Sequence, residues 1–416
     1  YKWNMKIIYI FAMKKLLMRK IERKTYMEKL LDWKDKQVIK VVRGVRRCGK
    51  STLLEMYQDR LRAENVDDSQ IIAINMEDFD FIELRDPKEL YRYVNARLVK
   101  EKKCYVFLDE IQRVENYADV VDALFVKDNV DLYLTGSNAY MLPSEIATLL
   151  SGRYVEIKMQ PLSFSEYVAY MGDWDNLADK YKDYITNSSF PYTLELRSGR
   201  NLIGNYLDGI YNTVVMKDVM QRKEINDAMM LESVVRFVMS NAGITLSTKK
   251  IAEAITSSGR KVDSKTVELY LQALCESFIL YKVQQFNFHG IQMQRSLEKY
   301  YLVDVALRRA LPCNHTADMG QILENVVFLE LQRRYQYVGK MDDTEVDFVA
   351  IDEDRTSYFQ VSVTTKERNT LIRKLAPLKA IANHNPKYLL TLDNDPEINY
   401  NGIKKMNALQ WLLGGF

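Results

Sequence analysis

The feature that most constrains this chain is a glycine-containing segment that directly follows a largely apolar stretch, residues 38–42. The segment reads Gly44-Val45-Arg46-Arg47-Cys48-Gly49-Lys50-Ser51-Thr52. Its fixed positions have the spacing G-x-x-x-x-G-K-[ST], which between a strand and a helix is typical of a phosphate-binding loop. The glycines let consecutive backbone N–H groups point at phosphate oxygens, and the following helix directs its positive end at the same anion. We therefore predict that the chain binds a nucleoside triphosphate.

Each part of this loop has an expected role toward ATP and Mg²⁺. Lys50 should reach the β- and γ-phosphates, and the hydroxyl of Ser51 should ligate Mg²⁺. The remaining expected contacts to the nucleotide come from Gly44, Arg46, Arg47, Cys48, Gly49 and Thr52.

Composition limits the other classes of function. At 416 residues, the chain is long enough for two or three domains with their own cores. Its 59 Lys and Arg residues nearly balance 56 Asp and Glu residues, so net charge gives no support to a nucleic-acid partner. The four cysteines form no C-x-x-C pair, which argues against a zinc site or a disulfide framework and favours a reducing cytoplasm.

The first 24 residues form a basic N-terminal segment. Its apolar run, residues 7–13, is far shorter than a membrane span, and no signal-peptide cleavage site follows it. Residues 14–24 contain six basic side chains against the single acid Glu22. A solvated helix face is favoured for this run, with binding to acidic lipid or nucleic acid as the alternative.

A second motif points to the same chemistry. The buried-strand pattern of residues 104–108 runs directly into Asp109 and Glu110. In a P-loop domain such a pair would orient the metal through Asp109 and activate the attacking water through Glu110. The two carboxylates could instead merely cap the next helix, but their occurrence together with the phosphate loop favours catalysis.

Three more polar residues follow the next strands. Ser137 and Asn138 come after the strand pattern of residues 131–134, where a polar side chain would sense the γ-phosphate. Arg153 directly precedes a fifth strand, residues 154–158, and is the best candidate for an arginine finger in its own or a neighbouring subunit. Five strands alternating with helices predict an α/β domain, residues 25–165, with a parallel sheet covered on both faces.

With these residues in view, the chain resembles the bacterial and archaeal AAA-like ATPases that carry a C-terminal domain of unknown function. The resemblance implies ATP binding and hydrolysis, and it names no physiological substrate. Such ATPases usually have Gly-Gly-x-Pro where this chain has Ser188-Ser189-Phe190-Pro191, which puts a tight glycine turn in question. The motifs that carry the likeness are the phosphate loop, Leu108-Asp109-Glu110-Ile111-Gln112, Thr135-Gly136-Ser137-Asn138-Ala139, Leu150-Ser151-Gly152-Arg153-Tyr154, Pro161-Leu162-Ser163-Phe164-Ser165-Glu166-Tyr167, Tyr211-Asn212-Thr213-Val214 with Lys217-Asp218, Lys299-Tyr300-Tyr301-Leu302-Val303-Asp304 and Glu324-Asn325-Val326-Val327.

Residues 166–290 are expected to form a helical lid and a winged-helix region. Two short helices, residues 247–257 and 263–276, precede the strand-like residues 278–283. The second helix would face DNA in such a fold, but Lys265 is outnumbered there by three acids, Asp263, Glu268 and Glu276. Internal packing or protein contact is therefore favoured over DNA reading.

Residues 291–416 match the outline of a restriction-endonuclease-like domain. Glu324 would lie on a helix, Asp347 on a strand, and Gln360 and Ser362 on its neighbour. Acids at such positions bind Mg²⁺, and a lysine stabilises the attacking water. Because Ser362 cannot supply that charge, and nothing fixes Lys366 as a substitute, we expect the fold without the cleavage.

The sequence thus predicts a Mg²⁺-dependent ATPase that couples ATP binding or hydrolysis to its C-terminal domain and that could form a homo-oligomer. Two alternatives remain open. One is a nucleotide-dependent signalling switch with little turnover. The other is an ATP-driven protein that acts on nucleic acid and carries a degenerate nuclease domain.

Overall fold

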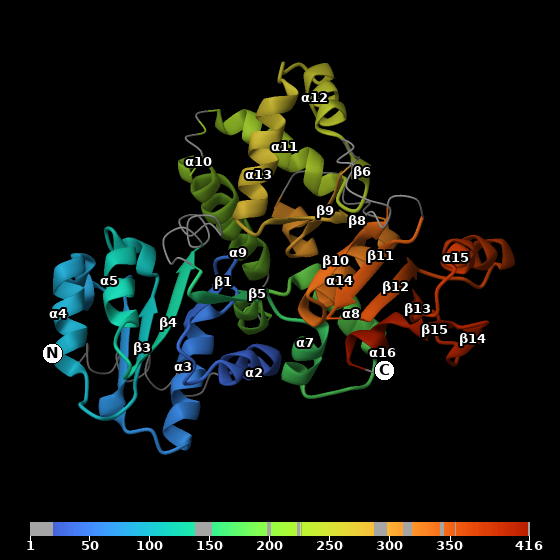
Figure 1. The fold of residues 1–416 in the computed structure, drawn as a ribbon. Helices are drawn as coiled ribbons and strands as arrows, with labels where there is room; N and C mark the ends of the chain where they lie inside the picture. The colour runs from blue at the N-terminus through green and yellow to red at the C-terminus, as the bar shows by residue number, and fades with distance from the viewer. Residues whose placement is uncertain are drawn as a thin grey trace.

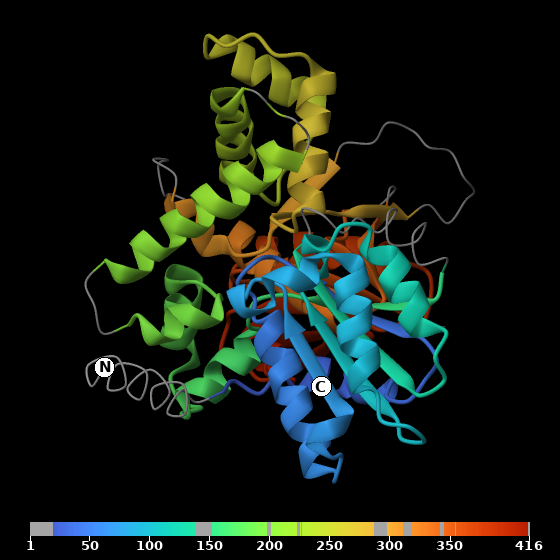
Figure 2. The same ribbon diagram turned by 90° about the vertical axis from the view of Figure 1, so that its left-hand side faces the viewer.

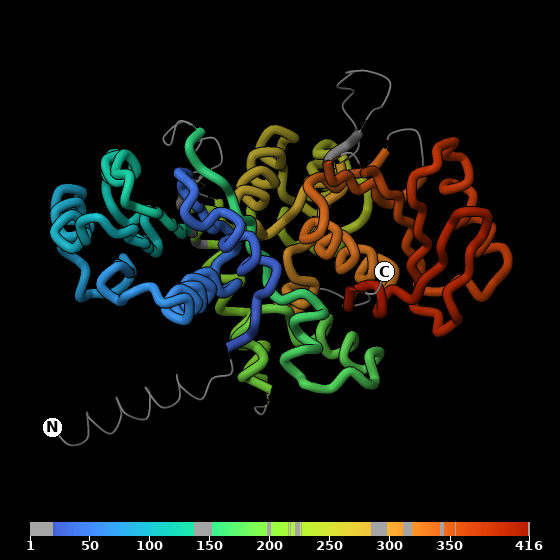
Figure 3. Tube along the Cα trace, turned by 60° about the horizontal axis from the view of Figure 1, so that its bottom comes forward, coloured from blue at the N-terminus to red at the C-terminus, as the bar shows by residue number. Residues whose placement is uncertain are grey.

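The computed structural model describes residues 20–137, 152–197, 201–222, 225, 227–286, 298–310, 318–341, 345–353 and 355–414. Two large sheets lie at opposite ends of the molecule, the N-terminal one in blue and cyan and the C-terminal one in orange and red (Figure 3). Helices from the middle of the chain lie between and above them (Figure 1).

The N-terminal sheet is entirely parallel, as predicted. Its spatial order is β2-β3-β4-β1-β5, so the first strand lies between the fourth and the fifth. The strands are β1 (Ile39–Gly44), β2 (Ile71–Asn75), β3 (Cys104–Asp109), β4 (Val130–Ser137) and β5 (Tyr154–Met159). Burial on both faces explains why these segments read as nearly continuous apolar runs in the sequence.

Helices cover both faces of this sheet. On one face, α3 (Lys50–Ala63) packs against the β1 side chain of Val42. On the other, α4 (Pro87–Arg97) and α5 (Tyr117–Phe125) pack in one core with its neighbour Val41. Successive residues of a strand point to opposite faces, so one strand serves two cores. This arrangement confirms the expected α/β domain.

The middle of the chain is mainly helical, and α11, α12 and α13 project above the region between the two large sheets (Figure 1 and Figure 2). It also contains a small antiparallel sheet with the order β6-β9-β7. The helices, with α2 from the N-terminal region, are α2 (Lys24–Asp32), α7 (Phe164–Met171), α8 (Leu177–Asn187), α9 (Leu202–Ile210), a π-helix (Tyr211–Asp218), α10 (Val219–Arg222), α11 (Ala228–Ser240), α12 (Thr248–Ser257) and α13 (Ser264–Glu276); the strands are β6 (Thr245–Leu246), β7 (Leu280–Lys282) and β9 (Glu298–Leu302).

The C-terminal sheet has seven strands in the order β14-β15-β13-β12-β11-β10-β8. Strands β10, β11 and β12 form an antiparallel meander, and α15 then carries the chain across to β13, which pairs with β12 in parallel. The elements are β8 (Gln284–Phe286), α14 (Met319–Arg334), β10 (Tyr337–Met341), β11 (Phe348–Asp352), β12 (Arg355–Ser362), α15 (Arg368–Ala380), β13 (Lys387–Thr391), β14 (Ile398–Tyr400), β15 (Ile403–Asn407) and α16 (Ala408–Leu412).

The middle and C-terminal sheets exchange strands across residue 290, where the sequence suggested a domain boundary. Strand β8 precedes that position, yet it pairs with β10 of the C-terminal sheet. Strand β9 follows it, yet it pairs with β6 and β7 of the middle sheet. The middle part of the chain and the C-terminal part are therefore interleaved. Strand β9 pairs with the middle sheet and also contacts α14 of the C-terminal part.

In the described part of the chain, the remaining helical elements are short 3₁₀ helices at Asp68–Gln70, Phe79–Arg85, Ile111–Arg113, Pro191–Glu195 and Val305–Ala310.

In the part of the chain that the structure describes, no helix has both the length and the apolar character needed to cross a membrane.

Candidate functional site

The phosphate loop joins the end of β1 to the start of α3, and its shape depends on both glycines. A Cβ atom at Gly44 would lie only 2.0 Å from the carbonyl oxygen of Met159, so a side chain has no room there. Gly49 caps α3 with a φ of 101°, a left-handed conformation that glycine adopts without strain. The buried Lys50 turns its ammonium group back into the loop, where it donates to the carbonyl oxygens of Gly44 at 3.1 Å and Val45 at 3.4 Å.

The predicted metal-orienting acid lies directly beside this loop. Asp109 ends β3, and its carboxylate is hydrogen-bonded by the hydroxyls of Ser51 and Thr135. These two hydrogen bonds favour the charged form and lower the pKa of the Asp109 carboxyl, but burial has the larger effect. The pKa is therefore raised above its ordinary value. Thr135 also accepts the backbone N–H of Glu110 at 3.0 Å, so one hydroxyl orients both acids. This role of Thr135 was not predicted, although the residue comes directly after the strand pattern of residues 131–134 in the sequence.

Glu110, the predicted general base, follows Asp109 in a left-handed backbone conformation with a φ of 54°. Its carboxylate accepts a hydrogen bond from the side-chain amide of Gln112. The turn directs Glu110 into the same cavity that Lys50 and Ser51 line. The structure therefore brings the phosphate loop and both acids together.

The cavity beside the loop has a volume of about 560 Å³, within the range of small-molecule and cofactor sites. Its lining combines the polar residues of the loop with aromatic and aliphatic side chains. The ring centroids of Tyr192 and Tyr206, two of these aromatic residues, lie 5.3 Å apart. The lining residues are Lys20, Ile21, Arg23, Arg46, Arg47, Gly49, Lys50, Ser51, Thr52, Leu53, Glu55, Glu77, Glu110, Leu162, Tyr170, Pro191, Tyr192, Glu195 and Tyr206.

These groups fit ATP together with Mg²⁺. A hydroxyl and a buried carboxylate that already touch one another, Ser51 and Asp109, are the oxygen donors that Mg²⁺ prefers. The ammonium group of Lys50 and the amino end of α3 match phosphate oxygens, and the aromatic side chains that line the cavity match a base.

Arg23 anchors the phosphate loop from outside. It is only 3% exposed, and it donates to the carbonyl oxygens of Cys48 at 3.0 Å and Gln160 at 2.6 Å. Its Nε also pairs with Glu166 at 2.9 Å. The expectation of a solvated basic face was therefore wrong for Arg23, because three separate segments use its guanidinium group. The same expectation agrees with Lys20, whose side chain is 43% exposed and pairs with Asp59.

Two other loop residues differ in how they face the site. The thiol of Cys48 is fully buried in the core, and this burial raises its pKa, so only its backbone is available to a ligand. Arg46 contacts the cavity and pairs at 3.4 Å with Asp218, the last residue of the π-helix. The loop is thus linked to the helical part of the chain.

One of the two predicted sensor residues, Ser137, lies at the end of β4. Ser137 is the last residue of that strand and pairs in register with Gly44, which puts its backbone next to the phosphate loop. Asn138 lies outside the described residues.

Arg153, the predicted arginine finger, lies at the opposite end of the sheet from the loop. Its neighbour Tyr154 begins β5 and pairs with Ile39, whereas the loop starts at Gly44, five residues or about 17 Å further along β1. The side chain is 45% exposed and pairs loosely with Asp122 at 3.7 Å. Arg153 therefore cannot reach the phosphate loop of its own chain.

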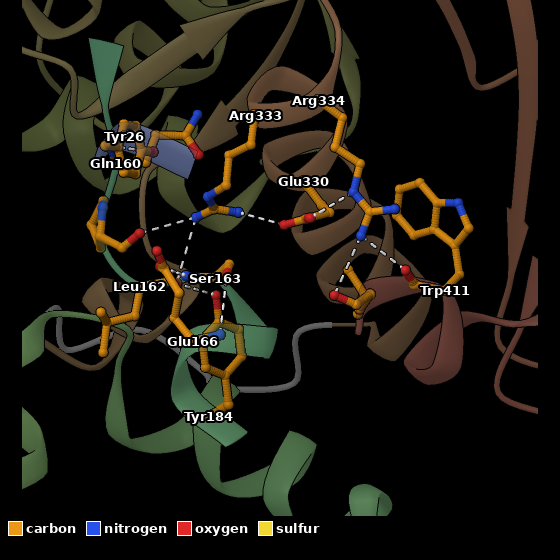
Figure 4. Close-up of polar contacts among 12 residues, drawn as sticks. Tyr26, Gln160, Leu162, Ser163, Glu166, Tyr184, Glu330, Arg333, Arg334 and Trp411 are labelled. Carbon is orange, nitrogen blue, oxygen red and sulfur yellow. Dashed lines mark hydrogen bonds and ion pairs between the residues drawn. The ribbon is translucent and has the colours of Figure 1, made fainter. Parts of the chain in front are cut away.

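A polar network connects the segment after β5 with the C-terminal domain (Figure 4). Arg333 of α14 donates to the carbonyl oxygens of Pro161 at 3.1 Å and Leu162 at 3.5 Å, and it pairs with Glu330 at 3.1 Å. Arg334 binds the other oxygen of Glu330 at 2.7 Å and extends the network to α16. Pro161 also accepts from Arg23, so the same short segment is held from both sides.

The second predicted cluster is also assembled in the C-terminal domain. Burial, reinforced by the nearby charge of Asp347, raises the pKa of Glu324. Asp347 accepts from the backbone of Val361 at 2.8 Å, and its own N–H donates to Gln360 at 3.2 Å. Glu324, Asp347 and Gln360 therefore meet at one place. No set of three His, Cys, Asp or Glu side chains suited to a metal ion occurs within the described ranges.

Two lysines approach these acids, and neither is the exposed Lys366. Lys374 of α15 lies 3.5 Å from Asp347, and Lys299 of β9 pairs with Glu324. The sequence offered no signal for either contact, because each depends on how a distant element packs.

Comparisons with solved structures give only weak similarity. The Walker-type ATPase PABY2304 of Pyrococcus abyssi matches 70% of this chain and 96% of its own, at 13% identity and a TM-score of 0.47. The ORC1 protein of Aeropyrum pernix, solved in complex with DNA, matches 71% of this chain and 94% of its own, at 14% identity and a TM-score of 0.32.

Sequence comparisons are more decisive. Residues 36–168 match an AAA domain, and residues 178–318, C-terminal to it, match a domain of unknown function (DUF8612). An uncharacterized protein of Methanocaldococcus jannaschii, MJ1544, is 27% identical over 79% of this chain and 76% of its own. An uncharacterized protein of Haemophilus influenzae is 35% identical over 94% of this chain and 98% of its own. This chain therefore belongs to the same family as the Haemophilus influenzae protein, and it is a P-loop ATP-binding protein with an AAA domain.

Proposed function

We propose that this protein is a Mg²⁺-dependent ATPase whose nucleotide site is coupled to its C-terminal domain. The observation that carries the proposal is the hydrogen bond between Ser51 and Asp109, formed beside Glu110 at the cavity that contains Lys50. Hydrolysis of ATP needs a metal site, a phosphate cradle and a base within reach of one another, and this cavity supports all three.

Each group then has a defined role. Lys50 binds the β- and γ-phosphates, Ser51 holds Mg²⁺, and Asp109 orients it. Bound Mg²⁺ would supply the positive charge that neutralises the transferring phosphoryl group. Glu110 accepts a proton from the attacking water, and Gln112 holds its carboxylate in place until the substrate arrives. Ser137, or the next residue in the sequence, Asn138, senses the γ-phosphate.

The arginine finger is Arg153 of a neighbouring subunit. Its exposure and its distance from the loop of its own chain support a role in trans, and an active homo-oligomer follows from that role.

The test is ATP turnover by the wild type and by Lys50→Ala and Glu110→Gln, each with and without DNA and over a range of protein concentrations. Glu110→Gln should bind ATP and turn it over at least about a hundredfold more slowly. Lys50→Ala should weaken binding itself. The exposed Glu115, five residues further along, provides the matched control, since Glu115→Gln should behave as the wild type. Turnover by Glu110→Gln at the wild-type rate would overturn the assignment.

A nucleotide switch with little turnover is the first alternative. The contact between Arg46 of the loop and Asp218 of the π-helix favours it, because nucleotide could rearrange that pair without hydrolysis. Tight ATP binding with no turnover at any protein concentration would support the switch.

The second alternative acts on nucleic acid through the C-terminal domain. The element order α14-β10-β11-β12-α15-β13 supports the proposal of a restriction-endonuclease-like fold, and the order α11-β6-α12-α13-β7-β9 supports that of a winged helix. Lys374 could supply the charge that Ser362 lacks. However, lysines already neutralise both Glu324 and Asp347, so we favour an inactive scaffold.

Cleavage of DNA and RNA in Mg²⁺ or Mn²⁺ tests this alternative. Activity lost in Asp347→Asn and kept in Asp352→Asn, at the other end of β11, would establish a nuclease. If neither the wild type nor the two variants cleave DNA or RNA, the C-terminal domain is an inactive scaffold.

A further inference from the structure

Residues 188–192, which we call the serine turn, lie against the phosphate loop. The side chain of Pro191 approaches within 3.8 Å of the position that a Cβ atom at Gly49 would take. Pro191 and Tyr192 also line the nucleotide cavity together with Lys50. The serine turn therefore forms part of the cavity wall next to the phosphate loop.

The serine turn keeps a glycine conformation without a glycine. Ser188 has a φ of 78° and a ψ of 151°, a region that is essentially restricted to glycine because a Cβ atom crowds the backbone there. Such strain persists only where the surrounding structure holds the residue in place. The sequence put a tight turn in question here, and the structure forms one with serine in the strained position.

The carboxylate of Asp304 holds the serine turn in this conformation through hydrogen bonds. One carboxylate oxygen accepts the hydroxyl of Ser188 at 2.9 Å and both the N–H and the hydroxyl of Ser189 at 2.5 Å. The other oxygen accepts the N–H of Ala306 at 2.8 Å. Because each oxygen receives a backbone N–H, an amide side chain would have to point its NH₂ group at one of them. Only a carboxylate matches this set of donors.

Asp304 is 2% exposed and follows β9 almost directly. The same strand carries Lys299 and Tyr301, which both contact Glu324 of the second cluster. Asp304 thus connects the chain that leaves β9 to the serine turn.

We propose that Asp304 is a positioning residue for the nucleotide site, which fixes Pro191 and Tyr192 against the phosphate loop by holding Ser188 in its strained conformation. This inference rests on the proposed function, since it requires that the cavity bind ATP. It adds a residue that lies outside the loop and outside the acid pair.

The experiment is a double-mutant cycle with Asp304→Asn, Ser188→Gly and the double variant. Binding of a fluorescent ATP analogue, KM, kcat and thermal unfolding would be measured for each. Asp304→Asn should raise the Kd and KM for ATP about tenfold and change kcat less, because the phosphate loop and Glu110 are untouched. Ser188→Gly removes the strain, so adding Asp304→Asn to it should raise KM about threefold or less.

Asp393→Asn is the matched control. Asp393 is also a buried carboxylate that accepts from a backbone N–H and two hydroxyls, those of Thr364 and Thr365. It lies two residues after β13 in the C-terminal domain and does not line the nucleotide cavity. Its substitution should lower the unfolding temperature and leave the Kd for ATP unchanged.

The outcomes separate this inference from the proposed function. If the wild type binds ATP but does not hydrolyse it, the proposed ATPase function fails. The Kd values of the variants would still test whether Asp304 positions the nucleotide site. A wild type that binds no ATP would overturn both. If Asp304→Asn lowers thermal stability but keeps the Kd within twofold of wild type, the inference fails alone. If Asp304→Asn does not fold, an unchanged Kd in the Ser188→Ala, Ser189→Ala double variant would overturn it as well.

Discussion

The guanidinium group of Arg23 donates a hydrogen bond to the carbonyl oxygen of Cys48 at 3.0 Å, which ties the start of the described chain to the phosphate loop. Arg23 also holds Glu166 and the carbonyl oxygen of Gln160. One buried side chain therefore joins the loop, the end of β5 and the beginning of α7.

Replacing this residue tests that connection. Arg23→Ala should lower the free energy of unfolding by about 3 kcal/mol, because it leaves the carboxylate of Glu166 without its partner. It should also weaken ATP binding, because the loop loses its external support. Chemical denaturation and nucleotide titration would measure the two effects. The exposed neighbour provides the control, since Lys24→Ala should change neither, and an Arg23→Ala protein of wild-type stability would contradict the account.

Arg153 allows a complementation test of subunit cooperation. Arg153→Ala should lower turnover at least about a hundredfold with little change in ATP affinity, because the residue would act only on the transition state of a neighbouring site. Glu110→Gln is expected to be inactive for a different reason. Mixing the two should restore activity, since an intact Arg153 can then serve an intact Glu110. An equal loss of affinity and rate in Arg153→Ala, or no recovery on mixing, would remove the role in trans.

Tyr192 should contribute to recognition of the base. It lines the cavity and pairs with the ring of Tyr206 at 5.3 Å. Tyr192→Ala should weaken ATP binding about tenfold, as expected from the loss of one aromatic stacking contact, and leave binding of inorganic triphosphate unchanged. Tyr192→Phe keeps the ring and should bind as the wild type. Equal weakening of both ligands by Tyr192→Ala would show a general disturbance of the cavity.

Asp393 makes the C-terminal domain sensitive to acid. Burial alone would raise its pKa, but hydrogen bonds from Thr364 and Thr365 and the nearby Lys405 outweigh it and lower the pKa to about 2. A carboxyl whose pKa falls on folding stabilises the protein above its unfolded pKa, and this contribution disappears as the pH drops toward 2. The shift corresponds to about 2 kcal/mol at neutral pH.

The corresponding measurement is denaturant unfolding between pH 7 and pH 3, followed by the fluorescence of the buried Trp411. Wild type should lose stability over this range, and Asp393→Asn should start lower and depend less on pH. Parallel curves for the two proteins would show that another group titrates.

The sequence predicted those parts of the site that lie in short contiguous motifs. Gly49, Lys50 and Ser51 are adjacent, and Asp109 and Glu110 end a recognisable buried strand. Local geometry alone then fixes what their side chains can do.

The residues that support the site could not be predicted in this way, because their partners are remote. Arg23 and Gln160 are 137 positions apart, and Ser189 and Asp304 are 115 apart. The lysine beside Asp347 comes from α15, whose packing across the sheet no local pattern specifies. Strand exchange at residue 290 was missed for the same reason, since periodicity identifies a strand without naming its neighbour.

The central claim is that this chain hydrolyses ATP through Glu110, and the identity of the bound nucleotide tests it most directly. Wild type and Glu110→Gln would each be incubated with ATP and Mg²⁺, separated from free nucleotide, and analysed for the nucleotide they retain. We predict ADP on the wild type and intact ATP on Glu110→Gln. ADP on both proteins in equal proportion would contradict the role of Glu110, and intact ATP on both would favour a switch over an ATPase.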